Sequence, residues 1–148
     1  MELSKSADAA IRKHVEGYLA SFNDHKREAG HEAVAKVVAS AFVEKPAPMF
    51  IGAAGVSVGQ KAIAERFAKQ ASTRFKDAKI SLRINSLTPV GTDVVMVGTS
   101  CLAAGIRRLN GDPVPDLKSN SLLTVVKDGS GWKIATHTVV NETADLKA

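Results

Sequence analysis

The sequence predicts an α+β domain in which three N-terminal helices pack on one side of a curved antiparallel sheet. Apolar residues recur at helical spacing over about the first 75 residues, and after Phe75 they alternate as in extended strands. Helices followed by a run of strands are typical of α+β folds. The 148 residues, 45% hydrophobic and 24% charged, have the length and composition of one globular domain, expected over residues 1–148.

Three helices account for the helical part of the chain. The first is expected over residues 6–24, where one apolar stripe recurs at offsets 0, 4, 7, 8 and 11. The second is expected over residues 31–42, because Gly30 interrupts the chain before it and Pro46 prevents its continuation. A third, shorter helix is expected over residues 60–71. The stripe of the first helix consists of Ile11, Val15, Tyr18, Leu19 and Phe22.

Strands account for most of the remaining chain. A short strand at residues 49–51 and a glycine-flanked hairpin around residues 56–58 precede the third helix. After Phe75, four longer strands are expected to form an antiparallel meander, because turn segments rich in glycine, proline, asparagine and aspartate separate them. These strands cover residues 80–87, 94–106, 117–126 and 132–140.

The two central strands are apolar on both faces, whereas an antiparallel sheet with one solvated side alternates apolar and polar residues. The helices can cover one face, so a second copy of the chain is expected to cover the other, as a homodimer through the sheet. One apolar set in the second long strand consists of Val94, Met96 and Leu102. The other set, assigned to the contact between the two copies, consists of Val95, Val97, Cys101 and Ala103.

The net charge of +5, from 20 Lys and Arg against 15 Asp and Glu, is scattered along the chain. A nucleic-acid surface needs its basic residues clustered on one face, so no nucleic-acid partner is expected. No apolar run approaches the roughly 20 residues of a membrane span, and the N-terminal segment has no signal-peptide pattern. The sequence therefore predicts no membrane partner and a cytoplasmic location.

No metal and no cofactor are expected. Cys101 is the only cysteine, and its place in a valine-rich strand favours a buried thiol over a reactive one. His14, His25 and His31 do not have the i, i+4 spacing of helical zinc sites, so they are expected on solvent-facing helix positions.

Four segments resemble the nuclear transport factor 2-like superfamily, and within it the SnoaL-like and SgcJ/EcaC-like relatives of ketosteroid isomerase. Residues 22–24 are similar to the close of the first helix, and residues 59–63 to the Gly-x-x-x-Ile entry into the third. Residues 93–97 look like the valine-rich strand of the family, and residues 124–134 resemble its late Asp-Gly-x-Trp-x-Ile hairpin. The resemblance implies a cystatin-like, cone-shaped α+β barrel, usually dimeric through the sheet, with an apolar cavity between helices and sheet.

Acid–base chemistry has few candidate residues in the strands. The four long strands contain no Asp or Glu, which excludes a strand carboxylate as the base of a ketosteroid isomerase mechanism. His137 is the strand residue able to exchange a proton near neutral pH. Simple alternation places His137 on the face opposite Trp132 and Ile134, toward the second copy, and only a bulge would reverse that.

The function expected is that of a small-molecule-binding protein with an apolar pocket between helices and sheet, a small apolar ligand and no assignable catalysis. One alternative is a lyase or isomerase that acts on a small apolar carbonyl compound through Tyr18 and His137. Another is a protein-interaction module that docks through the sheet. The expected pocket walls are Tyr18, Phe22, Phe50, Met96 and Trp132.

Overall fold

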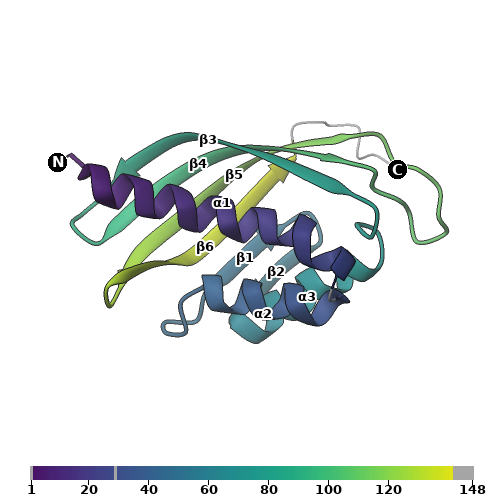
Figure 1. The fold of residues 1–148 in the computed structure, drawn as a ribbon, viewed down its shortest axis with the longest axis horizontal. Helices are drawn as coiled ribbons and strands as arrows, with labels where there is room; N and C mark the ends of the chain where they lie inside the picture. The colour runs from purple at the N-terminus through teal and green to yellow at the C-terminus, as the bar shows by residue number, and fades with distance from the viewer. Residues whose placement is uncertain (1, 29, 142–148) are drawn as a thin grey trace.

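A long helix lies across a curved six-stranded sheet, and two shorter helices lie below the C-terminal half of that long helix (Figure 1). The computed structural model describes residues 2–28 and 30–141, and within them every side chain except those of residues 21, 22, 24–28, 30 and 31. The expected α+β class is confirmed, with three helices and six strands in the described chain.

The helices begin and end close to the expected positions. Helix α1 spans Lys5–Glu28 and is capped by Ser4, whose Oγ accepts a hydrogen bond from the Ala7 amide at 3.1 Å. Helix α2 spans Gly30–Ala41, and α3 spans Gln60–Ser72. None of the helices in the described ranges is long and apolar enough to cross a membrane.

The sheet has the strand order β2-β1-β6-β5-β4-β3. All neighbouring strands are antiparallel except β1 and β6, which run parallel, so the early hairpin of β1 and β2 extends the meander at its β6 edge. The sequence predicted this hairpin but not its place in the sheet. The strands are β1 Met49–Gly52, β2 Gly55–Val58, β3 Lys79–Pro89, β4 Val94–Ala104, β5 Leu117–Asp128 and β6 Gly131–Asn141.

The core lies between the helices and one face of the sheet. Val95 and Val97 of β4 are fully buried there, together with Leu123 and Val125 of β5. The prediction for the contact between two copies is therefore wrong, because the set assigned to it points toward the helices. That set consists of Val95, Val97, Cys101 and Ala103. Strand alternation separates the two sets correctly, but both sets are apolar, so alternation alone does not say which one the helices cover.

The opposite side of the sheet, here called the open face, carries the other apolar set. Leu102 of β4, Leu122 of β5 and Val140 of β6 are 37%, 43% and 62% exposed. Met96 lies on this face as well, since it alternates with the buried Val95 and Val97. Its expected place as a wall of a pocket between helices and sheet is therefore wrong.

A one-residue bulge in β6 changes which side chains face the core. Thr124 of β5 pairs with Thr136, but the next residue, Val125, pairs with Ile134, so Ala135 is an extra residue in β6. Ile134, before the bulge, and His137, after it, therefore both face the helices, and both are buried. The alternation that placed His137 on the open face is reversed by this bulge.

Candidate functional site

Tyr18 and His137 meet in the core between α1 and β6. The tyrosine hydroxyl and His137 Nδ1 are 2.9 Å apart, and both side chains are buried. Tyr18 reaches this position because it lies on the inward stripe of α1, and His137 reaches it because of the bulge at Ala135. The Tyr18–His137 pair therefore joins residues 119 positions apart in the sequence.

Aromatic rings hold the pair in place. The ring of Phe50 stands edge-on to the imidazole of His137, with centroids 5.0 Å apart and planes at 88°. Phe42 meets the Tyr18 ring in the same way at 5.4 Å and 89°. Such edge-to-face contacts fix ring orientation as well as bury area, so the two polar groups have little freedom to turn.

Burial keeps both members of the pair uncharged. It lowers the pKa of His137 to about 3, so the imidazole is neutral at physiological pH. It also raises the pKa of the Tyr18 phenol well above its ordinary value, an effect that the nearby Arg66 guanidinium partly opposes. His137 Nε2 is buried and has no hydrogen-bond partner among the described residues. A neutral imidazole with one free nitrogen can accept or donate a proton at that atom.

Arg66 of α3 is a polar neighbour that sequence reasoning missed. Its guanidinium lies over the Phe50 ring, 4.6 Å from the centroid, and Nη1 donates a hydrogen bond to the Gly55 carbonyl at 2.8 Å. No pattern in the sequence distinguishes Arg66 from the other basic residues, because its role depends on the return of β1 and β2 to the sheet.

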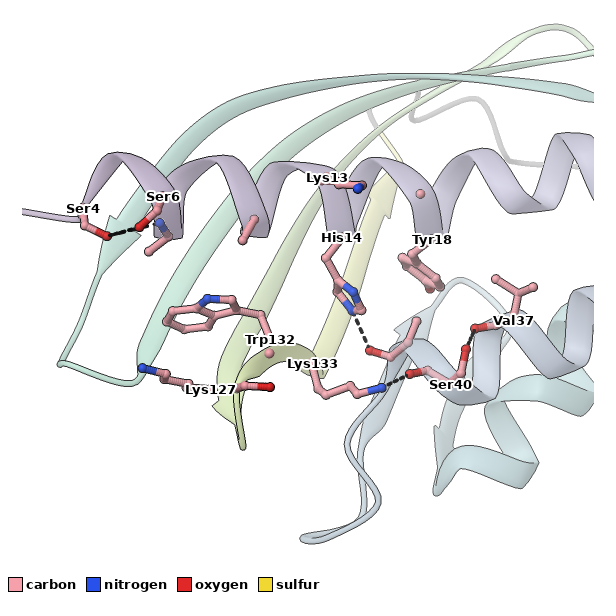
Figure 2. Close-up of a pocket in the computed structure, with 16 residues that line it drawn as sticks. Ser4, Ser6, Lys13, His14, Tyr18, Val37, Ser40, Lys127, Trp132 and Lys133 are labelled. Atoms are coloured by element: carbon pink, nitrogen blue, oxygen red, sulfur yellow. Dashed lines mark hydrogen bonds between the residues drawn. The ribbon is translucent and has the colours of Figure 1, made fainter.

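A groove of about 910 Å³ opens beside the pair, between α1, the end of α2 and the β5–β6 turn (Figure 2). Tyr18 belongs to its wall, so one side chain connects the groove with the buried histidine. The indole of Trp132 lies across the space below α1 (Figure 2). Most of the remaining wall comes from α1 with its cap and from the ends of β5 and β6, including Ser4, Ser6, Lys13, His14, Gly17, Lys127 and Lys133.

Two groove residues donate hydrogen bonds to carbonyl groups at the C-terminal end of α2. His14 Nε2 donates a hydrogen bond to the Ala41 carbonyl at 3.0 Å, and Lys133 Nζ donates one to the Ser40 carbonyl. Helix C-termini leave carbonyls without intrahelical partners and favour positive charge. His14, expected toward solvent, is thus half-buried at a helix end, and α2 itself has no basic residue in its last turn.

The structure brings together only some of the predicted site residues. Tyr18 and Trp132 line the groove, whereas Phe50 packs beneath it against His137. The predicted Phe22 side chain lies outside the described part of the chain. Asn23 of α1 lies away from the pair and holds the backbone of Ile80, donating to its carbonyl at 2.7 Å and accepting from its amide at 2.9 Å.

Comparisons with known proteins show which fold the chain has. No family model matches the sequence, and no curated protein matches it either. A solved structure of an uncharacterized protein with a cystatin-like fold from Caulobacter vibrioides is similar, with a TM-score of 0.78, 15% identity and coverage of 95% of this chain and 92% of that one.

Two further solved structures are similar. A ketosteroid isomerase-like protein from Erwinia carotovora atroseptica has a TM-score of 0.68 and 17% identity, over 91% of this chain and 95% of that one. An NTF-2 like protein of unknown function from Shewanella oneidensis has a TM-score of 0.67 and 13% identity, over 89% of this chain and 97% of that one. The chain thus has the cystatin-like fold of the nuclear transport factor 2-like proteins, as the resemblance in its sequence led us to expect.

Proposed function

We propose that the protein binds a small organic molecule in the groove beside Tyr18 and Trp132. The observation that carries this proposal is the groove itself, whose 910 Å³ lies within the range of about 300–1,000 Å³ typical of ligand sites. Trp132 and Tyr18 offer it aromatic surface, and the serines and lysines offer hydrogen bonds. The ligand has an apolar body, as the sequence predicts, but the lining is not purely apolar.

Gly17→Leu tests this proposal. Gly17 lines the groove, and nothing lies within 4 Å of a Cβ added there, so a larger side chain projects into open space. We expect the variant to fold at least as well as the parent, since glycine in a helix costs about 1 kcal/mol relative to alanine. Binding should be lost because leucine occupies part of the groove.

The readout is the single tryptophan of the chain, Trp132, whose indole N–H gives one cross-peak in a nitrogen–proton correlation spectrum. Cinnamate, cinnamyl alcohol and a general fragment set are titrated, and we expect at least one compound to shift this peak. Ala9→Leu is the control, because Ala9 is exposed on the same helix and does not line the groove. If no compound shifts the peak, or if Gly17→Leu leaves binding intact, the proposal is wrong.

A second candidate function is proton transfer on a small carbonyl compound, as in a lyase or isomerase. The hydrogen bond of the Tyr18–His137 pair favours it, and so does the fold shared with a ketosteroid isomerase-like protein. In such a reaction the Tyr18 hydroxyl would polarise the substrate carbonyl by donating a hydrogen bond to it. His137 Nε2, which is enclosed in the core, would accept the proton next to that carbonyl after a movement that opens this atom to the substrate and raises the pKa of His137 from about 3.

Deuterium exchange into cyclohexanone and 2-tetralone in heavy water measures this activity. The parent protein should accelerate exchange over buffer, and His137→Gln should lower the rate by about 10²–10⁴-fold, as expected for loss of a general base. Tyr18→Phe should lower it as well, because the donor to the carbonyl is removed. Exchange no faster than in buffer, or equally fast in His137→Gln, would exclude this candidate.

We also propose that the open face pairs with a second copy of the chain. Leu102, Leu122 and Val140 are exposed on this face, which also carries Met96, and several large apolar side chains exposed on one sheet face among polar residues are typical of a protein–protein contact. Sedimentation equilibrium should therefore show a dimer at tens of micromolar. A monomer would contradict the pairing and favour the alternative in which this face docks a different protein.

A further inference from the structure

Three lysines from different parts of the chain surround the groove. Lys13 comes from α1, Lys127 from the end of β5 and Lys133 from the start of β6, and all three line the same space (Figure 2). The described lining contains no Asp or Glu. The groove is therefore a positively charged pocket within a surface whose charges are otherwise mixed.

These lysines have no acidic partners among the described residues. The ion pairs found there join Asp8 with Arg12, Glu65 with Lys61 and Asp77 with Arg107, all other side chains. Asp8, the acid of α1 that lies one turn from the groove, is already held by Arg12 at 2.7 Å. Lys133 gives one of its three donors to the Ser40 carbonyl, which leaves two for a ligand.

The start of α1 adds to the positive potential. Ser4, Ser6 and Ala7, at the N-terminal end of this helix, also line the groove, and a helix N-terminus carries a partial positive charge. Like charges brought together in one cleft repel each other and attract a counter-ion. Trp132 and Tyr18 add aromatic surface in the same space, so charge and apolar contact are offered together.

We infer that the ligand of the groove is an organic anion, whose carboxylate is attracted by the positive groove that Lys13, Lys127 and Lys133 line and whose flat apolar body packs on Trp132. This inference rests on the proposed binding function and adds to it the charge of the ligand. It differs from the wholly apolar ligand expected from the sequence, because the three lysines are far apart in the chain and only the fold brings them to one cleft.

Cinnamate and cinnamyl alcohol provide the test, since they share a flat body and differ in charge. We expect the Trp132 indole peak to report binding of cinnamate at least about tenfold tighter than of the alcohol at low salt, for a carboxylate that meets two or three lysines. The preference should shrink near about 1 M salt, where charges are screened beyond about 3 Å.

Variants of the groove lysines test whether the ligand carboxylate interacts with them. Lys13→Gln and Lys127→Gln should each weaken cinnamate binding about threefold, as expected for the loss of one exposed ion pair, and should weaken binding of the alcohol less. Lys79→Gln is the control, because Lys79 is exposed on β3 and outside the groove. Equal affinity for both probes, or a cinnamate preference that both groove variants retain, would overturn the inference while groove binding stands. If neither probe nor any fragment binds, the proposed function fails and the inference with it.

Discussion

Val97→Asp is expected to leave no folded protein. Val97 is fully buried in β4, within the core between the sheet and the helices, and none of its buried neighbours in that cluster carries a positive charge. An unpaired carboxylate there costs several kcal/mol, comparable with the total stability of about 5–15 kcal/mol of a typical domain. Circular dichroism and a proton–nitrogen spectrum should show an unfolded chain.

Met96→Asp is the matched control, one residue away in the same strand. Its side chain lies on the open face, so the new carboxylate stays in contact with water in the monomer. We expect this variant to fold normally and, because it places a charge in the proposed contact, to sediment as a monomer. A folded, monomeric Val97→Asp together with an unfolded Met96→Asp would mean that the two faces of the sheet are the reverse of those described.

Stability is expected to fall steeply as the pH drops below about 6.5, because of His137. The pKa of His137 is about 3 in the folded protein, against an ordinary value of 6.5 in the unfolded chain. Between these values the unfolded chain binds a proton that the folded protein does not, so unfolding becomes more favourable as the pH falls. Above pH 6.5 His137 is neutral in both the folded and the unfolded chain, so the free energy of unfolding no longer changes with pH on its account.

The expected slope is about 1.4 kcal/mol per pH unit, which amounts to about 2 kcal/mol at pH 5 and on the order of 5 kcal/mol by pH 3. Urea unfolding at a series of pH values measures it. His137→Gln removes the titrating group and can still accept a hydrogen bond from Tyr18, so its slope should be shallower by that amount, whatever its absolute stability. Parallel pH profiles for the two proteins would show that His137 is not buried and neutral.

Local patterns predicted the elements of this fold well, because periodicity and turn residues are local. Helix α3 begins at Gln60 as expected, and β4 begins at Val94. The orientation of the sheet was not predictable in the same way, because Val97 and Met96 are both apolar and only tertiary packing distinguishes them. The site depends even more on long-range contacts, since Tyr18 meets His137, and Lys13 and Lys127 line one groove, only after the chain folds.

The bulge at Ala135 affects which single-codon deletions the gene can tolerate. Ala135 is the extra residue of the bulge, and it has no partner of its own in the pairing of β5 with β6. Loss of its codon would remove the bulge and leave Ile134 and Thr136 as neighbours in a regular ladder, so His137 would still face the core. A scan of single-codon deletions should therefore find codon 135 tolerant, in contrast to codon 138, whose loss would turn Val139 from the core to the open face.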